Sequence, residues 1–526
     1  MHLVDSISLE VFKNLLISVA EEMGVSLCRT AYSPNIKERR DYSCAVFDSK
    51  ARMVAQAAHI PVHLGSMPAS VHAALEGFDL EAGDMVILND PYLGGTHLPD
   101  ITIVSPVYDP NNTDRRIGFV ANRGHHADIG GMTPGSLPLS QELYQEGLII
   151  PPLKLASRGK LNDELIQLIC RNSRTPEERK GDLAAQIAAT KTGEQRLQDI
   201  CSKYGPDTLA EHTEALLDYS ERMTRAAIKS LPDGVYSFKD FMDDDGLSDQ
   251  PLVIHATTSI KGDSIVFDFE GTAPQTVGCI NAPLAVAQSA ALYTIRCITG
   301  PAAPANEGCM RPITVAAPVG CLVNPTPQHG VAGGNVETSQ RIVDVLFGCM
   351  AQALPDIIPA ASQGSMNNIL VGGNNPLTGS PYVYYETIAG GMGARPTKDG
   401  LSGVHTHMTN TLNTPIEALE FQFPFRVTRY TIRRGTGGAG KFAGGDGLIR
   451  DLLFLTPAKA TILSERRRFA PYGLNGGSPG TKGENKLLKD GVEEVSLNGK
   501  ATFDVTPGDI LSIRTAGGGG WGQSST

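Results

Sequence analysis

The sequence lacks the long apolar run that a membrane-spanning helix requires. No stretch of its 526 residues approaches 18 consecutive apolar residues, and the N-terminal segment carries acidic residues early instead of an apolar signal core. An excess of positive charge is also missing, because the net charge is −11. These absences argue against a transmembrane protein, a secreted protein and a general binder of nucleic acid or anionic membranes. We therefore expect a soluble, cytoplasmic protein.

Paired cysteine motifs and aromatic residues are also scarce. The nine cysteines are odd in number and never form a C-x-x-C pair. This argues against zinc-finger and iron–sulfur motifs and fits reduced thiols in the cytosol. Aromatic residues make up only 6% of the chain, whereas glycine and proline number 57 and 34, so we expect many turns and irregular loops.

Hydrophobic periodicity predicts both helices and strands. Helical spacing of apolar residues predicts helices at 7–28, 161–170, 176–204, 208–231, 284–299 and 339–354. Alternation predicts a strand pair at 44–56 and further strands at 84–88, 99–107 and 115–121, the last two joined by a polar turn at 109–115. Several strands follow residue 232, and strands with glycine turns continue from about 420 to the end.

Changes in this pattern place soft domain boundaries near residues 232 and 420. The first region, 1–231, carries the candidate metal-binding and catalytic residues and includes a helical segment at 158–231. A middle α+β region spans 232–420, and a β-rich region spans 421–526. We therefore predict an α+β protein with a multi-layer mixed fold, a central helical segment and a β-rich, glycine-rich C-terminal part.

Six of the twelve histidines lie between residues 59 and 126, in a stretch that is also rich in Asp and Gly. Within it, His97 and Asp100 are three residues apart, and His125 and His126 are adjacent. Neutral imidazoles and carboxylates are the ligands that a borderline divalent metal selects, and such a metal activates water at neutral pH. The alternative is that these are ordinary loop or interface histidines. The pattern does not decide which of the two adjacent histidines would face the metal.

Strand pairing would bring the two halves of this candidate site together. The first His/Asp pair lies at the start of the strand predicted at 99–107, and the adjacent histidines follow the strand predicted at 115–121. If these strands are antiparallel neighbours, both groups arrive at the same edge of the sheet.

Four further motifs are less specific. Asp41 stands beside two arginines just before a predicted strand. This position suits a general base, and the alternative is that Asp41 belongs to a surface ion pair. His405-x-His407 suggests a second metal or substrate-contact site, with a hydrogen-bonded cluster as the alternative. Residues 435–441 match a phosphate-loop pattern but lack the following hydroxyl residue and helix, so we interpret them as a hairpin turn. Residues 465–468 suggest a solvated or subunit-facing basic patch.

Long segments of the sequence resemble the hydantoinase B / 5-oxoprolinase family. They are RTAYSPNIKERRDYSCAVFD, IPVHLGSMPASV, GDMVILNDPYLGGTHLPDITIVSPVY, NRGHHADIGGMTPGS, GGNVETSQR, HTHMTNTLNTPIEALE and the C-terminal FAGGDGLIRD and ERRRFAPYGLNGG. The matching segments run from about residue 7 to Gly522, nearly the whole chain.

The resemblance implies a subunit of an ATP-dependent enzyme that opens cyclic amides such as hydantoins, 5-oxoproline or lactams. An A-type partner subunit would bind ATP and Mg in a hetero-oligomer such as α2β2, which fits the missing phosphate loop. In family terms, the ligands of a divalent metal (Zn, Mn or Fe) fall on His97, Asp100, His125 or His126 and, more weakly, Asp90. The proposed base of the family falls on Asp41, which would deprotonate the attacking water.

Two rival interpretations remain open. Relatives in the wider family are subunits of ATP-dependent acetone or acetophenone carboxylases, although those are generally longer. The second rival interpretation is that the chain is a non-catalytic scaffold for the ATP-binding partner. The sequence identifies neither the ring that is opened nor the metal, because specificity depends on the contours of the pocket.

Overall fold

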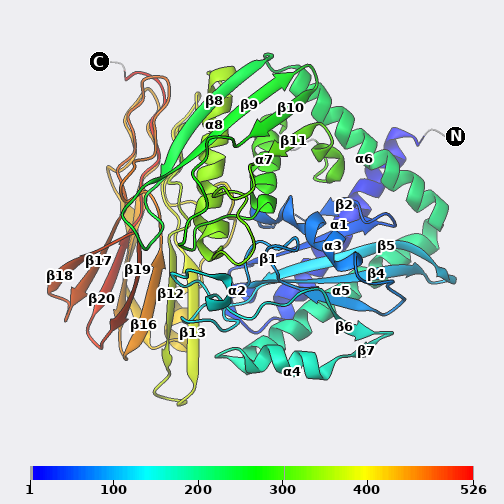
Figure 1. Ribbon diagram of the computed structural model, residues 1–526, viewed down its shortest axis with the longest axis horizontal. Helices are drawn as coiled ribbons and strands as arrows, with labels where there is room; N and C mark the ends of the chain where they lie inside the picture. Colours follow the sequence, from blue (N-terminus) through cyan, green and yellow to red (C-terminus); the bar gives the residue numbers. More distant parts are fainter. Residues whose placement is uncertain (1–3, 58, 301–302, 525–526) are drawn as a thin grey trace.

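A seven-stranded antiparallel sheet forms the first region of the protein. The structure, a computed structural model, describes residues 4–57, 59–300 and 303–524 (Figure 1). The strand order is β2-β1-β5-β4-β3-β6-β7, and each neighbouring pair is antiparallel. The strands are β1 (Tyr42–Asp48), β2 (Met53–Gln56), β3 (Met85–Leu88), β4 (Asp100–Asp109), β5 (Asn112–His125), β6 (Leu153–Ser157) and β7 (Lys160–Leu161).

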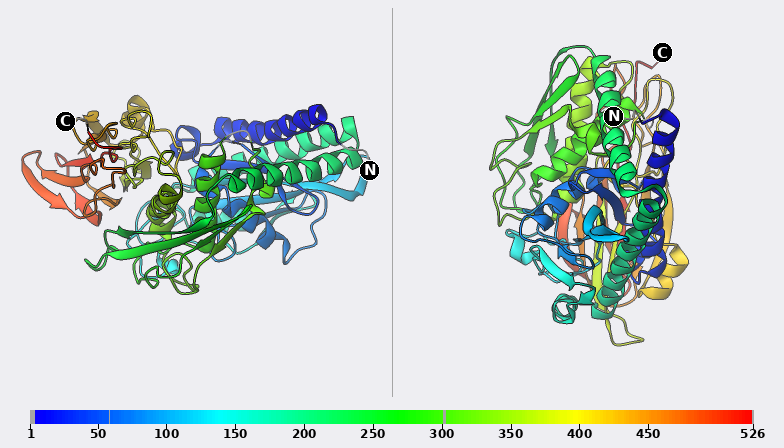
Figure 2. Two further views of the ribbon diagram at one scale, coloured as in Figure 1. Left: turned by 90° about the horizontal axis from the view of Figure 1, so that it is seen from above. Right: turned by 90° about the vertical axis from the view of Figure 1, so that its right-hand side faces the viewer.

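Helices cover both faces of this sheet. They are α1 (Ser6–Thr30), α2 (Pro34–Lys37), α3 (Ser66–Leu75), α4 (Asp163–Arg171), α5 (Pro176–Tyr204) and α6 (Pro206–Lys229). Alternate residues of β1 join different hydrophobic clusters: Cys44 and Val46 pack with α1 and α5, whereas Ala45 and Phe47 pack with α3. Figure 2 shows α1, α5 and α6 as long helices that lie side by side. Within the described ranges, no helix combines the length and apolarity needed to cross a bilayer.

Local sequence signals explain where the long helices begin and end. The carboxylate of Asp5 accepts hydrogen bonds from the backbone N–H groups of Ile7 (2.9 Å) and Ser8 (3.0 Å) and so caps α1. Pro176 stands in the first turn of α5, where its missing N–H breaks no helical hydrogen bond. Gly205, at φ 87°, ends α5 and allows α6 to start at once. The helices predicted in this region are confirmed.

The hairpin of β4 and β5 is longer than the sequence predicts. Its antiparallel pairing is confirmed, but Asp109 pairs directly with Asn112, so only two residues form the turn. The polar turn predicted at 109–115 is therefore wrong in extent. Residues 112–114 are exposed, and polar side chains are compatible with a strand end that projects into solvent.

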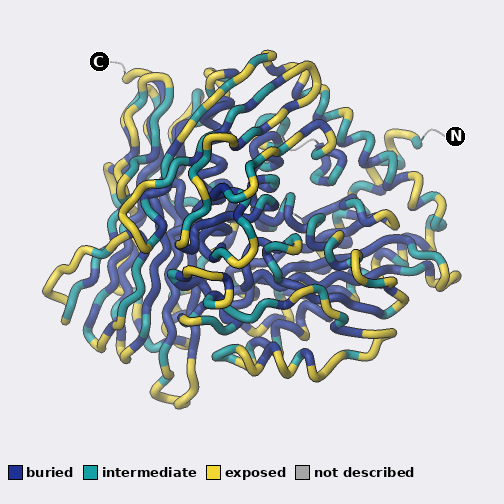
Figure 3. Tube along the Cα trace, viewed as in Figure 1, coloured by how far each residue is buried: buried dark blue, intermediate teal, exposed yellow. Residues whose placement is uncertain are grey.

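The middle region combines a four-stranded sheet with two helices. The strand order is β11-β10-β9-β8, with β10 and β11 parallel. The elements are β8 (Gly234–Met242), β9 (Leu252–Lys261), β10 (Ser264–Asp268), β11 (Ile313–Ala316), α7 (Leu284–Thr299) and α8 (Ser339–Ala353). Helix α8 packs on β8 and β9, and α7 packs on α8. Figure 3 shows the chain buried between these layers and exposed along their outer edges. Both predicted helices are confirmed.

Two antiparallel sheets make up the C-terminal part. Their orders are β13-β12-β16-β19 and β14-β15-β20-β17-β18. The elements are β12 (Asn368–Asn374), β13 (Pro381–Thr387), α9 (Ile416–Gln422), β14 (Phe425–Arg433), β15 (Gly447–Phe454), β16 (Ala458–Leu463), β17 (Glu484–Lys489), β18 (Glu493–Leu497), β19 (Lys500–Val505) and β20 (Ile510–Arg514). The β-rich character predicted beyond residue 420 is confirmed. However, β12 pairs with β16, so one sheet spans the boundary expected near residue 420.

Glycine-rich segments at this end pack backbone against backbone. Gly438 donates to the carbonyl of Gly518 (2.8 Å), and Gly518 donates to that of Gly445 (2.9 Å). A Cβ atom on Gly518 would lie 2.2 Å from the carbonyl oxygen of Met392, so there is no space for a side chain. The segment 435–441 belongs to this packing and connects the antiparallel strands β14 and β15. Its interpretation as a hairpin turn is confirmed.

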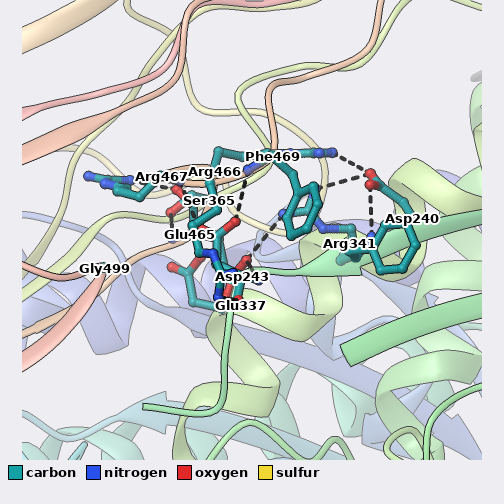
Figure 4. Close-up of polar contacts among 12 residues, drawn as sticks. Asp240, Asp243, Glu337, Arg341, Ser365, Glu465, Arg466, Arg467, Phe469 and Gly499 are labelled. Carbon is teal, nitrogen blue, oxygen red and sulfur yellow. Dashed lines mark hydrogen bonds and ion pairs between the residues drawn. The ribbon is translucent and has the colours of Figure 1, made fainter. Parts of the chain in front are cut away.

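A buried network of ion pairs joins the middle and C-terminal parts (Figure 4). Arg466, which follows β16, contacts Asp240 of β8 at 2.8 Å and Asp344 of α8 at 2.5 Å. Arg341 of α8 contacts Asp240 at 3.2 Å and Glu465 at 3.4 Å. The exposed basic patch predicted at 465–468 is thus wrong for Glu465 and Arg466, because acidic and basic partners from distant segments bury them.

Candidate metal centre

Three adjacent strand ends meet at one edge of the seven-stranded sheet. Strand β4 begins at Asp100, β5 ends at His125, and these two residues pair directly. The backbone N–H of His125 donates to the carbonyl of Asp41 (3.0 Å), the residue before β1. Antiparallel neighbours place the start of one strand beside the end of the next, so all three residues arrive together. The predicted meeting of the two His-containing segments is confirmed.

His97, Asp100 and His125 form a compact buried group, which we call the metal group. Nε2 of His97 lies 3.2 Å from Nδ1 of His125 and 3.2 Å from Oδ2 of Asp100. Nδ1 of His125 lies 3.2 Å from Oδ1 of Asp100. The three side chains are 0%, 1% and 3% exposed in sequence order, so they are removed from bulk water.

The donor atoms of the metal group fit a divalent metal. Four ligands at Zn–N distances of about 2.0–2.1 Å stand about 3.3 Å apart, close to the 3.2 Å separations observed. Two imidazole nitrogens that face each other share at most one proton. The other ring nitrogens, Nδ1 of His97 and Nε2 of His125, are buried without a hydrogen-bond partner in the described part of the chain. Two imidazoles and a carboxylate suit Zn, Mn or Fe.

Neighbouring side chains hold Asp100 as a carboxylate. The hydroxyl of Thr96 donates to Oδ2 of Asp100 (2.6 Å), and Nε2 of His63 lies 3.3 Å from the same oxygen. Burial alone would raise the pKa of Asp100. The charges of His97 and His63, with hydrogen bonds from His125 and His63, instead hold that pKa well below its ordinary value. Outer contacts of this kind orient metal ligands.

Asp41 reaches the same edge from β1. The preceding residue, Arg40, has φ 57°, a left-handed conformation that turns the chain sharply between α2 and β1. Oδ2 of Asp41 lies 3.7 Å from the guanidinium of Arg39, and 10% of the Asp41 side chain is exposed. The guanidinium carbon of Arg39 lies 4.5 Å from the centre of the Tyr385 ring. That ring stacks on the ring of His125, with 4.8 Å between the two ring centres. The candidate base and the metal group therefore share one wall.

His126 and Asp90 lie outside the metal group. Successive residues of a strand face opposite sides, and Nε2 of His126 lies 2.9 Å from the amide oxygen of Gln186 on α5. Asp90 accepts a hydrogen bond from the N–H of Tyr92 (2.9 Å) in the turn after β3. The sequence leaves open which adjacent histidine faces the metal, and the geometry brings His125, but neither His126 nor Asp90, into the group.

The second histidine pair lies beside a cavity, so a substrate-contact role for it stays a prediction. His405 and His407 lie in a loop between β13 and α9, not on a strand. Nε2 of His407 lies 3.6 Å from Oδ1 of Asp344, but neither ring nitrogen of His405 has a hydrogen-bond partner among the described residues. Both rings line a cavity of about 500 Å³ together with Tyr293 and Cys297.

A larger cavity borders residues 54–57 and 59–61, which precede the metal group in the sequence. Its volume is about 670 Å³, and Gln56, His59 and Asn410 are among the residues that line it. The ring of His59 packs edge-on against Tyr42 (4.7 Å), the residue after Asp41. The metal group itself does not line this cavity.

Several residues contact the metal group although the sequence does not single them out as site residues, and His63 and Asn335 are among them. His63 belongs to the same His-rich stretch, so the composition of that stretch could have marked it as a candidate site residue. Asn335 lies far away in the chain, yet its Nδ2 is 3.1 Å from Nε2 of His97. The GGNVETSQR segment that contains Asn335 is conspicuous only as a glycine-dense motif, and no spacing rule connects it to the histidines.

The chain belongs to a defined family of proteins. A family model described as hydantoinase B/oxoprolinase matches residues 5–524. The chain is therefore a member of the hydantoinase B/oxoprolinase family, as its motifs indicate.

Two named relatives differ in how much of their length this chain covers. The chain is 38% identical to 5-oxoprolinase 1 of Arabidopsis thaliana, over 99% of this chain and 42% of that protein. It is 34% identical to a putative D-/L-hydantoinase subunit of the B type from Pseudomonas sp. (strain NS671), over 99% of this chain and 90% of that protein. The chain thus spans less than half of the plant protein but most of the bacterial one.

Two solved structures share the fold. The ATP-dependent caprolactamase from Pseudomonas jessenii has a TM-score of 0.91 and 28% identity, over 99% of this chain and 92% of that chain. An acetone carboxylase in a nucleotide-free structure has a TM-score of 0.88 and 18% identity, over 98% of this chain and 76% of that chain. The predicted mixed α+β fold is confirmed.

Proposed function

We propose that this chain is the metal-binding, catalytic B-type subunit of an ATP-dependent hydrolase that opens cyclic amides. The observation that carries the proposal is the metal group beside Asp41, in a chain that matches the ATP-dependent caprolactamase over 99% of its length. Hydantoins, 5-oxoproline and lactams are the candidate rings, in line with the names of the relatives.

A partner subunit would activate the substrate. An amide is a poor electrophile, and phosphorylation of its carbonyl oxygen by ATP makes the carbon open to attack. The glycine loop at 435–441 is occupied by backbone packing and offers no phosphate site. One relative is named as a B-type subunit, and the plant 5-oxoprolinase extends well beyond the length that this chain covers. Both facts support a partner subunit. We propose that this is an A-type subunit that uses ATP and Mg, in an assembly such as α2β2.

Asp41 would act as the general base. One of its carboxylate oxygens accepts the proton that water loses as it attacks the activated carbon. The ring C–N bond then breaks as its nitrogen takes up a proton, and hydrolysis of the resulting acyl phosphate releases phosphate. The guanidinium of Arg39, 3.7 Å away, holds that carboxylate in position. His97, Asp100 and His125 would hold the divalent metal, which when bound supplies Lewis-acid polarisation of an oxygen or orients a water.

Co-expression with the presumed A-type partner tests the proposal. The purified complex would be assayed for ADP release with 5-oxoproline, hydantoin and caprolactam, each with and without bicarbonate. We expect ring-dependent ADP release that does not need bicarbonate, and a stoichiometric divalent metal in the wild-type chain. Full ring-opening turnover by Asp41→Asn would remove the assignment of the base.

The same assay separates the rival functions. Acetone is therefore added as a fourth substrate, and turnover of acetone that depends on bicarbonate would indicate a ketone carboxylase, the activity that the likeness in fold to acetone carboxylase suggests. The higher identity and coverage of the caprolactamase favour the hydrolase. A chain that holds no metal, and whose His97→Ala variant keeps full activity, would be a scaffold for its partner.

A further inference from the structure

We propose that the side-chain oxygen of Asn335 completes the ligand set that His97, Asp100 and His125 offer to the metal. The proposal rests on the metal centre proposed above and adds a residue that is 238 positions from His97 in the sequence. It gives the centre two nitrogen and two oxygen donors.

The amide of Asn335 is aimed at the metal group. Its Nδ2 lies 3.1 Å from Nε2 of His97, the atom that also lies 3.2 Å from Asp100 and 3.2 Å from His125. Asn335 is 4% exposed, and its Oδ1 is buried with no hydrogen-bond partner among the residues that the structure describes. A buried amide oxygen without a partner is unfavourable, so a ligand that binds this oxygen would stabilise the position.

The charge of a metal would reverse the orientation of this amide. An amide N–H donates to the free lone pair of a ring nitrogen, but it repels a cation that occupies that lone pair. The oxygen and nitrogen ends of the amide are nearly the same in shape, so a half-turn exchanges them at little steric cost. The carbonyl oxygen then faces the metal, and carbonyl oxygens are suitable ligands for divalent cations such as Mn.

A π-helical turn holds Asn335 in this position. The turn spans Gly334–Thr338, directly before α8, and π-turns are rare and recur at functional sites. Gly334 allows the turn to lie against Asn281, since a Cβ atom would be 1.8 Å from the carbonyl oxygen of that residue. The hydroxyl of Ser339 donates to the backbone carbonyl of Asn335 (2.6 Å). The amide is thus carried by a regular element that limits its movement.

The same turn is tied to the opposite wall of the metal group. Oε1 of Glu337 accepts a hydrogen bond from the amide of Asn368 (2.8 Å), and the oxygen of that amide accepts one from the hydroxyl of Tyr385 (2.9 Å). The ring of Tyr385 stacks on His125. These contacts therefore fix the turn relative to the strand end that carries His125.

Cobalt binding to the full chain, freed of metal by chelation, tests this role. The visible absorption of Co²⁺ depends on the number and kind of its ligands. Asn335→Asp keeps an oxygen, so we expect it to bind one Co²⁺ with a spectrum like that of the wild type. Asn335→Leu keeps the size but offers no ligand, so we expect changed absorption bands and about 10–100-fold weaker binding. Asn335→Ala replaces the leucine variant if circular dichroism shows that the latter is misfolded.

Asn122→Leu is the matched control. Asn122 is a buried amide on β5 that contacts Gln186 and Thr190 instead of the metal group, so this variant should keep the wild-type spectrum. A wild-type spectrum and affinity in Asn335→Leu would overturn the proposal. Loss of Co²⁺ by Asn335→Asp as severe as by Asn335→Leu would assign the role to the N–H and overturn it too. A wild-type chain that binds none of Co²⁺, Mn²⁺ or Zn²⁺ would reject the metal centre and this ligand together.

Discussion

The metal group and the ion-pair network are both buried, but their charges are balanced in different ways. In the network, Arg341 and Arg466 are surrounded by carboxylates from three segments at 2.5–3.5 Å. In the metal group, the carboxylate of Asp100 faces imidazoles and a hydroxyl, and two ring nitrogens have no partner within the described ranges. The network also contains buried atoms without a hydrogen-bond partner in the described part of the chain, among them Nε of Arg341 and Nε of Arg466. Its opposite charges nevertheless face one another, whereas in the metal group the donor atoms converge on one point.

This difference separates a structural role from a binding role. Buried ion pairs that satisfy one another need nothing further and hold segments in place, while removal of one partner leaves a buried charge uncompensated. Donors that converge without a cation from the protein indicate a site for an external one. Variants of the network should therefore act on stability, and variants of the metal group on metal content and chemistry.

The largest effect should follow from Arg466→Met. The change removes one of the two guanidinium groups that face Asp240 and Asp344 and leaves Arg341 as the other. A buried carboxylate charge then lacks full compensation, so we expect a loss of about 3–5 kcal/mol in the free energy of unfolding. Urea denaturation followed by circular dichroism measures this loss. Arg468→Met, on the exposed part of the same segment, is the control and should cost less than about 1 kcal/mol. Equal stability of the two variants would contradict the structural role of the network.

Asp41→Asn should have an effect of similar size, but on catalysis. Loss of a general base lowers turnover about 10²–10⁴-fold. Its ring-opening rate in the complex and its metal content would be measured together. Because Asp41 is not in the metal group, the metal content should stay at the wild-type value. The urea midpoint should fall, since the variant leaves the buried guanidinium of Arg39 without this carboxylate, so turnover is compared far below the midpoint of either protein. A variant that lost its metal would show instead that Asp41 belongs to the centre.

Chelation should destabilise the wild-type chain but not Asp100→Asn. A metal that binds only the folded state adds about 2.7 kcal/mol when its free concentration is 100 times the dissociation constant. Comparing thermal midpoints with and without EDTA measures this contribution. The Asp100→Asn chain has lost a ligand, so its midpoint should not respond. Equal responses of the two chains would place the stabilising metal elsewhere.

The smallest effect is expected from His126→Gln, compared with His125→Gln. His126 contacts Gln186, so its replacement should cost about 1 kcal/mol of stability through one lost hydrogen bond and leave the metal content unchanged. His125→Gln should lose the metal. Metal analysis of both variants by mass spectrometry tests this prediction, and loss of metal from the His126 variant alone would reverse the assignment.

Particular elements show how far the sequence alone could be interpreted. The helices and the β4–β5 pairing could be predicted because apolar periodicity, caps and turn residues act locally. That pairing also placed His97 and Asp100 beside His125. The burial of Arg466 could not be predicted, because its acidic partners lie on β8 and α8. A run of arginines is the same in sequence whether solvent or carboxylates surround it.

The sequence by itself determined which residue types are available for metal chemistry, the strands that carry them and the family to which the chain belongs. The tertiary structure alone decided that His125, and not its neighbour His126, belongs to the metal group, because the direction in which a side chain points depends on the register of its strand. It also decided that Asn335 contacts His97, since a turn before α8 approaches a distant sheet edge only when the middle region packs on the first. Contacts between remote segments depend on packing geometry, and local patterns do not encode them.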